Sequence, residues 1–321
     1  MIKTTTLKNS PINPRDIEAL YLTYPWPAYQ NTPIAQAVRE KMWDSIVKQA
    51  PENVVIVLND NGPIATCIVS DVDYLSDYFG IKIGQICFVA GLEANTPDNA
   101  VAAQMLIGKA YSIIVEREYA FVQAVIPVPH TPVVHALELY GFQNYSGFLP
   151  MDGRATTGLV YLRTPQDFAI IEDNDLFLPD IKKVYEAVSF PAHLVDDPGF
   201  YKPRRRDPRL LYVQNFERAF KSDETKVFIA SLGDKFAGAI IAKIDSELGT
   251  SGQGMGLVVN PECSNMGIAK LLIRHRQYYY REEGVEYVSF GANMNNYCMI
   301  NCLESLGFKA NIPRLVFHRW M

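Results

Sequence analysis

The sequence lacks any apolar run of the ~18 residues that a membrane-spanning helix needs. Its start, MIKTTTLKNS, also lacks the apolar segment of a secretory signal. A strong charge of either sign is missing too, since 35 acidic residues against 30 basic ones give a formal charge of −5. We therefore expect a cytoplasmic protein without a membrane or nucleic acid as its partner.

Cysteine is scarce and carries no zinc-site spacing. The five cysteines are Cys67, Cys87, Cys263, Cys298 and Cys302. The last two lie four residues apart on an expected helix, but no His or second Cys pair accompanies them. We expect buried thiols and no metal site.

Two common nucleotide motifs are also missing from the sequence. It contains no GxGxxG dinucleotide fingerprint and no GxxxxGK[ST] phosphate loop. A nicotinamide enzyme and a nucleotide triphosphatase are therefore both disfavoured.

The 321 residues, 48% of them hydrophobic, suffice for two domains, and the chain repeats itself. A hairpin, a strand, a helix and a second strand recur in the same order in both halves. The matched pairs are 54–69 with 226–244, 84–91 with 254–261, 102–118 with 269–284, and 120–127 with 286–294. Each half then closes with a short helix ending in Gly-Phe, at 137–142 and 303–308. This order indicates duplication.

Hairpins early in each half and a strand–helix–strand crossover late predict an α/β fold with a mixed sheet and helices on both faces. The last strand of the first half gives way to the first strand of the second in GLVYLRTPQDFAI. We therefore expect domains at 1–165 and 166–321.

In the second half, residues 257–272 (LVVNPECSNMGIAKLL) run from a buried strand through a turn into a helix. Gly267 and Ala269 lie at the start of this helix. Small residues there let a phosphate approach backbone N–H groups at the positive end of the helix dipole. An ordinary tight turn explains the same residues, so the stretch alone leaves both interpretations open.

Together with Asn296 and the closing Leu-Gly-Phe (306–308), this stretch resembles the GNAT superfamily of acyl-CoA-dependent N-acyltransferases. The resemblance implies acetyl-CoA as donor and two tandem GNAT-like domains. It further implies that the pantetheine arm pairs with the strand as an added β-strand. The implied cofactor-binding residues are Leu257, Val258 and Val259 for pantetheine and the acetyl carbonyl; Ser264, Asn265, Met266, Gly267, Ile268 and Ala269 for the pyrophosphate; Asn296 for the pantetheine amides; and Leu303 near the thioester.

Two positions depart from the family pattern. Ser264 stands where Gln or Arg is usual, and Leu303 stands where a Tyr usually protonates the departing thiolate. Tyr297, Cys302 and His318 are candidates for that proton. The thiolate can also leave without an acid, because thiols are weakly basic. We expect water to take the proton of the amine.

Within the superfamily, the second half resembles dTDP-fucosamine acetyltransferases, through residues 207–220, 290–296 and 314–320. This resemblance implies a nucleotide-linked amino sugar as acceptor. Arg204 and Arg205 are then candidates for binding its diphosphate. A solvated loop is the alternative explanation of these arginines.

The first half is expected to be a degenerate, non-binding copy. In TPDNAVAA (96–103), Val101 falls at the position of Gly267, and His130 falls at that of Asn296.

The expected function is transfer of an acetyl group to a primary amine of a small molecule by a monomer or homodimer without a metal. One alternative keeps the fold and changes the acceptor to an aminoacyl compound, a polyamine or a carrier-protein thiol. The other is an acyl-CoA-binding sensor or partner-binding protein without turnover.

Overall fold

The chain forms two units, which we describe from a computed structural model. The structure describes residues 2–22, 24, 33–156, 162–173, 175–188, 190, 192–202, 205–244 and 251–321. The first unit holds the described residues up to Phe148 together with Ile312–Met321, and the second holds Leu149–Asn311. The boundary expected near residue 165 lies inside the second unit and stays a prediction about the duplicated halves.

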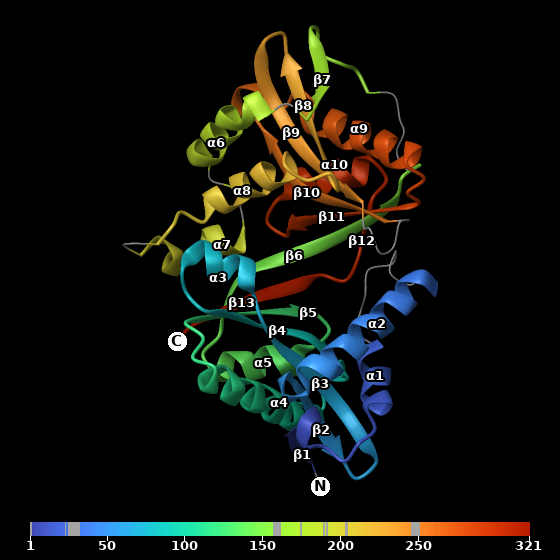
Figure 1. The fold of residues 1–321 in the computed structure, drawn as a ribbon, viewed down its shortest axis with the longest axis vertical. Helices are drawn as coiled ribbons and strands as arrows, with labels where there is room; N and C mark the ends of the chain where they lie inside the picture. Colours follow the sequence, from blue (N-terminus) through green and yellow to red (C-terminus); the bar gives the residue numbers. More distant parts are fainter. Residues whose placement is uncertain are drawn as a thin grey trace. The chain divides into compact units, whose positions relative to one another are not determined.

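The sheet of the first unit runs in the order β1-β2-β3-β4-β5-β13-β6 (Figure 1). Its strands are β1 (Lys3–Thr6), β2 (Val54–Asn59), β3 (Gly62–Asp71), β4 (Ile83–Ala90), β5 (Phe121–Pro127), β13 (Arg314–Trp320) and the start of β6 (Gln143–Arg154). Strand β13 comes from the C-terminus and pairs antiparallel with both β5 and β6. The last strand of the chain therefore completes the first unit.

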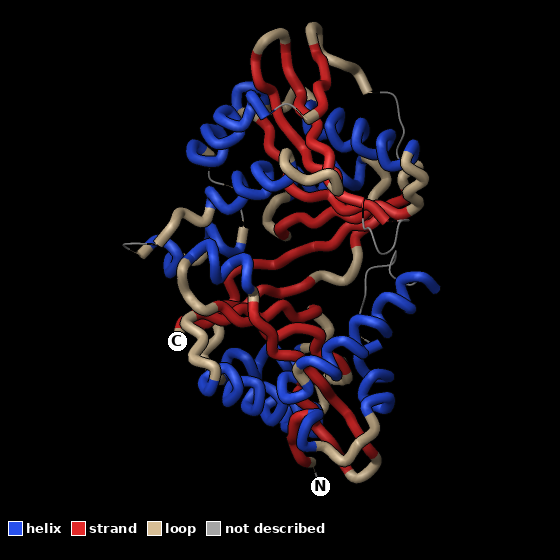
Figure 2. Tube along the Cα trace, in the orientation of Figure 1, coloured by secondary structure: helices blue, strands red, loops and turns tan. Residues whose placement is uncertain are grey.

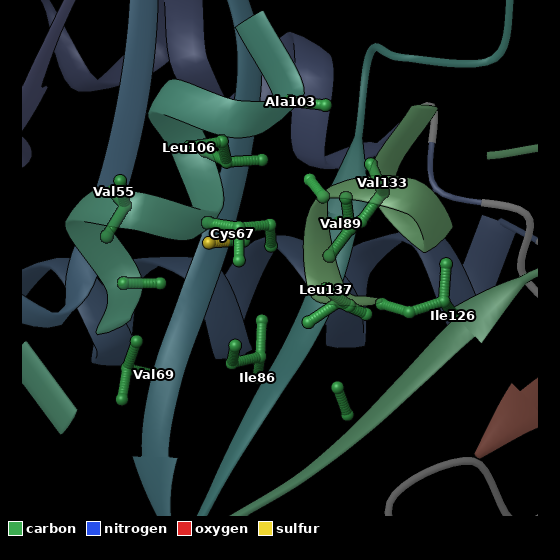
Figure 3. Packing of buried hydrophobic residues seen from close by; sticks show 14 of the residues in the cluster. Val55, Cys67, Val69, Ile86, Val89, Ala103, Leu106, Ile126, Val133 and Leu137 are labelled. Carbon is green, nitrogen blue, oxygen red and sulfur yellow. The ribbon is translucent and has the colours of Figure 1, made fainter. Parts of the chain in front are cut away.

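Helices cover both faces of this sheet. They are α1 (Pro14–Leu22), α2 (Pro33–Gln49), α3 (Asp73–Phe79), α4 (Pro97–Glu116) and α5 (Thr131–Leu139). The face under α4 and α5 carries the larger apolar core, in which side chains of the strands meet Leu106 and Leu137 (Figure 3). The opposite face packs Ile17, Tyr21 and Trp43 against β2 and β3. Burial on two faces explains the continuous apolar runs of these strands.

The second unit has a sheet in the order β6-β11-β10-β9-β8-β7. Its strands are the end of β6, β7 (Phe168–Glu172), β8 (Thr225–Leu232), β9 (Lys235–Ile244), β10 (Ser251–Val259) and β11 (Tyr287–Asn293), with the short β12 (Lys309–Ala310) paired to β6. Strands β8 and β9 form the expected hairpin.

Helices again flank the sheet on both faces (Figure 2). They are α6 (Leu178–Ala187), α7 (His193–Asp196), α8 (Arg209–Ala219), α9 (Ile268–Glu282) and α10 (Tyr297–Ser305). Helices α9 and α10 bury one core against the sheet, and α6 and α8 bury another. The mixed α/β fold and its repetition are thus confirmed.

The structure corrects the register of one repeat. Gly84 and Gly252 each lie in the parallel pairing of their unit. Each also lies beneath a tyrosine ring, Tyr119 and Tyr280, so close that a Cβ atom would come within 3 Å of it. Strand 84–91 therefore corresponds to 252–259, two residues earlier than the sequence comparison placed it.

Among the helices that the structure describes, none is long and apolar enough to cross a membrane.

Candidate functional site

Strands β10 and β11 separate part of the way along the sheet. They pair in parallel only over Ser251–Gln253 and Tyr287–Ser289. Strand β10 then carries a bulge at Gly256, whose φ is +54°, and remains paired with β9 up to Val259. From Leu257 onward, one backbone edge of β10 faces no described strand. A glycine inside a strand, here Gly256, is the sequence signal for such a bulge.

Only alternate residues of β10 present their backbone groups to this open edge. The Val258 carbonyl oxygen lies on the side of β9. A Cβ atom added to Gly238 of β9 would be 2.7 Å from this oxygen. Backbone groups alternate along a strand, so Leu257 and Val259 face the open edge. Of the three residues expected to hold pantetheine, Leu257 and Val259 have backbone groups on the open edge, and their role in binding stays a prediction. Val258 instead packs its side chain into the core under α6 and α8.

Asn260 fixes the turn that follows β10. Its Nδ2 donates a hydrogen bond to the Phe236 carbonyl at 2.9 Å, and its Oδ1 accepts one from the Glu262 N–H at 3.1 Å. The Asn260 side chain thereby fixes the turn to Phe236, at the start of β9. Asn260 was not among the residues predicted for the site, although Asn before Pro is a turn signal.

Gly267 begins helix α9 with a φ of +79°, and a Cβ atom there would meet no heavy atom within 4 Å. No side chain caps this helix, and its first turn contains no acidic residue. The first N–H groups of a helix have no intrahelical acceptor, and the dipole makes this end positive. Ser264, Asn265 and Met266 are exposed in front of it, and Asn265 also has a positive φ, +64°. The geometry suits an anion.

Ile268 and Ala269 form the first helical residues of this end. Ile268 buries its side chain in the core, and Ala269 packs partly against the same core. Both can therefore offer only their backbone N–H groups to a ligand.

Asn296 begins helix α10, as expected from the sequence. Its side chain accepts a hydrogen bond from the Met299 N–H at 3.2 Å. The carbonyl oxygen of the amide is thus used as a helix cap, while the NH₂ group can still donate. Tyr297, the next residue, is 68% exposed.

Cys302 and Leu303 lie on the inner face of α10. Leu303 is fully buried in the core of the second unit. Burial raises the pKa of the Cys302 thiol to about 11. A thiol with that pKa is a weaker acid than an ordinary thiol of pKa ~8.5, so it is poorly suited to protonate a thiolate.

His318, the third candidate for the acid, lies in β13 and therefore in the first unit. It is buried there, stacked on Tyr145 with ring centroids 5.0 Å apart and edge-on to Phe121 at 4.9 Å. Tyr297 and Cys302 belong to the second unit. The catalytic role of all three stays a prediction.

The basic loop before α8 is internally bonded. Arg204 lies outside the described residues. The Arg205 guanidinium donates to the Gly199 carbonyl. Arg209 forms a bidentate pair with Asp207, with Nη2 2.6 Å and Nε 2.9 Å from Oδ2 and Nε 3.1 Å from Oδ1. Arg205 and Arg209 thus stabilise the loop itself through these contacts.

Helix α4, the counterpart of α9 in the first unit, begins differently. Helix α4 begins at Pro97 and includes Val101, so an additional turn of helix occupies the place of the loop before Gly267. Thr96 caps this helix by accepting a hydrogen bond from the Asn99 N–H at 3.2 Å, and Asp98 adds a negative charge to the first turn. An anion would meet a satisfied and acidic helix end here. That the first half is a degenerate, non-binding copy stays a prediction.

Metal ligands do not gather in the described part of either unit, where no three His, Cys, Asp or Glu side chains come together.

Part of this chain matches a known protein family. Residues 191–308 match the profile of the Acetyltransferase (GNAT) family. No curated protein matches the sequence, and none of the matches supports a dTDP-fucosamine specificity.

Solved structures resemble the whole chain. A GCN5-related N-acetyltransferase from Sphaerobacter thermophilus is 14% identical with a TM-score of 0.58, over 99% of this chain and 95% of its own. A tandem GNAT protein from the clavulanic acid biosynthesis pathway is 12% identical with a TM-score of 0.54, over 100% of this chain and 98% of its own. The chain thus has the tandem GNAT fold, and its second half matches the Acetyltransferase (GNAT) family.

Proposed function

We propose that the protein is an acetyl-CoA-dependent N-acetyltransferase whose second unit holds the donor. The observation that carries the proposal is the open edge of β10, which leads directly into the uncapped start of α9. An extended polar arm can pair with such an edge, and a phosphate group fits such a helix end. Acetyl-CoA has both parts and supplies a thioester for acyl transfer.

The residues present fit this ligand. Gly267 leaves open space where a side chain would otherwise stand. The N–H groups from Gly267 to Lys270 lie at the positive end of α9, and Lys270 adds a positive side chain. Leu257 and Val259 supply backbone groups along the arm, and the NH₂ group of Asn296 supplies a further donor.

The chain contributes position and polarisation to the reaction. A backbone N–H on the open edge of β10, from Leu257 or Val259, polarises the thioester carbonyl by hydrogen bonding to its oxygen. Holding the amine beside that carbon removes the entropic cost of bringing the two together. Leu303 is buried and apolar, so it donates no proton to the leaving group.

The acceptor that we propose is a primary amine of a small molecule, with a nucleotide-linked amino sugar as the specific candidate. This candidate rests on the sequence resemblance of residues 207–220, 290–296 and 314–320. Arg205 is available to it only in part, because its guanidinium already binds the Gly199 carbonyl.

The test is release of free thiol from acetyl-CoA in the presence of an amine panel. The panel contains a dTDP-4-amino sugar, a polyamine and an aminoacyl compound. Thiol release that depends on one of these amines supports the proposal and identifies the acceptor class. A purified chain that binds no acetyl-CoA contradicts it.

A second function, an acyl-CoA-binding sensor without turnover, is favoured by one observation. The position expected to supply the acid holds the fully buried Leu303, and its neighbour Cys302 has a raised pKa. Acetyl-CoA binding without thiol release for any amine on the panel, or for a carrier-protein thiol, would favour this function.

A further inference from the structure

Arg276 of helix α9 is a fully buried cation without a hydrogen-bond partner. Its Nε, Nη1 and Nη2 atoms have no hydrogen-bond acceptor among the residues that the structure describes. The guanidinium instead lies over two aromatic faces, 5.6 Å from the ring centroid of Tyr280 and 4.8 Å from that of Phe290. Aromatic faces attract a cation but accept none of its five N–H groups in the way an oxygen does.

Such a residue is expensive for the fold. Arginine stays charged in proteins, and an unpaired buried charge destabilises the folded state more than an apolar side chain of similar volume. The first unit avoids this cost. Helices α4 and α9 are both followed by a residue with positive φ, Glu118 and Gly284. Counted back from these residues, Arg276 corresponds to Ala110, which is buried in the core.

Through Phe290, Arg276 contacts β11 next to the point where β10 and β11 separate. Phe290 directly follows Ser289, the last residue of β11 that pairs with β10. Along α9, Arg276 lies about 12 Å from Ile268, at 1.5 Å per residue. The open edge of β10 runs back over the same interval, from the loop at the helix start toward the point of separation.

We propose that Arg276 supplies a fixed positive charge that stabilises the thiolate leaving group in the acyl transfer. This inference rests on the proposed function. In the reaction, the amine nitrogen bonds to the acyl carbon and the carbon–sulfur bond breaks. The electron pair of that bond stays on sulfur, and the proton of the amine goes to water. A nearby cation lowers the energy of the sulfur anion without donating a proton, which meets the need left by Leu303.

The direct test is the pKa of the thiol of CoA bound to the protein, followed through the ultraviolet absorbance of the thiolate as a function of pH. In the unmodified protein we expect this pKa to lie about 1–2 units below that of free CoA. Arg276→Met should abolish the difference, and Arg276→Lys should retain part of it. The rate of acyl transfer in Arg276→Met should fall about 10-fold or more.

Arg274→Met is the matched control, because it removes the same charge from the same helix. Arg274 is half-buried and donates to the Tyr278 hydroxyl. This variant should leave the pKa of the bound thiol unchanged. In thermal denaturation without ligand, Arg276→Met should melt at a higher temperature than the unmodified protein, since the buried charge is removed.

Three outcomes separate the possibilities. A bound thiol whose pKa equals that of free CoA in the unmodified protein overturns the inference, whether or not the variants fold. An equal shift in the unmodified protein and in Arg276→Met also overturns it; if that variant fails to fold, Arg276→Gln replaces it. If the unmodified protein binds no CoA, the proposed function itself fails.

Discussion

Replacing Gly267 with Glu tests whether the start of α9 binds a phosphate group. A carboxylate attached there would occupy the position expected for the pyrophosphate and repel it. Gly284, at the other end of the same helix, provides a matched control. Both glycines have positive φ, +79° and +74°, and a Cβ atom at either would meet nothing within 4 Å.

The two variants should differ in stability and in acetyl-CoA affinity, and the two effects have different sizes. A residue other than glycine in the left-handed region costs about 1–2 kcal/mol, and this cost applies to both variants. The helix dipole adds about 0.3–1 kcal/mol against a carboxylate at the C-terminal end, so Gly284→Glu should be at least as destabilised as Gly267→Glu. Binding should differ in the opposite direction. A carboxylate at position 267 and a phosphate group ~5 Å from it would repel each other by about 3 kcal/mol at an effective dielectric constant of ~20. This energy corresponds to a rise of about 100-fold in Kd.

Calorimetric titration with acetyl-CoA, combined with denaturant unfolding, measures both quantities. We expect Gly267→Glu to lose at least about 100-fold in affinity while Gly284→Glu retains the affinity of the unmodified protein. If both variants keep the affinity of the unmodified protein, the start of α9 does not bind the phosphate group. If both lose affinity to the same extent, the loss comes from the stability of the helix.

Two further predictions concern buried or capping side chains. Asn296→Asp keeps the cap of α10 but loses the NH₂ donor, so acetyl-CoA affinity should fall about 10-fold at unchanged stability, whereas Asn296→Ala should also lose about 1 kcal/mol of stability. Unchanged affinity in Asn296→Asp would exclude the contact. Burial lowers the pKa of His130, partly opposed by the Glu93 carboxylate. The neutral ring is therefore favoured in the folded state, and stability should be complete above the unfolded pKa of ~6.5 and fall as the pH drops below it. His130→Gln should lose less stability than the unmodified protein between pH 7.5 and pH 5.5 in denaturant unfolding, and an equal loss would contradict this reasoning.

The repeated architecture was predictable because hydrophobic period and turn residues specify it locally. The hairpins at 54–69 and 226–244 and helix α9 appear as expected. Helix α4 begins at Pro97 instead of residue 102, because Thr96 and Pro97 make a strong helix start that the alignment with Gly267 obscured. The closing helix of the first half, expected over 137–142, begins six residues earlier, at Thr131.

The pairing of the C-terminal strand β13 within the first unit was not predictable from either half of the sequence alone. Strand β13 has a continuous apolar centre, residues 315–317, and nothing in its residues states that it pairs with β5 of the first unit. Pairing partners depend on the register of the whole sheet, which a single strand does not encode. As a residue of β13, His318 belongs to the first unit, whereas Tyr297 and Cys302 belong to the second.

At the site, sequence reasoning located the backbone elements better than the side chains. Gly267 and Asn296 begin their helices as expected. The open edge of β10 begins where β10 and β11 separate, and Arg276 contacts Phe290 of β11 next to that point. That point becomes visible only when the pairing of β10 with β11 is known.

The measurement that tests the account most directly is the stoichiometry of acetyl-CoA binding to the unmodified chain by isothermal titration calorimetry. We expect one equivalent per chain, because α4, the helix that follows β4 in the first unit, begins with a side-chain cap and an acidic first turn, whereas α9, the helix that follows β10, has neither. Two equivalents would contradict the degenerate status of the first unit, and no binding would contradict the proposed function as a whole.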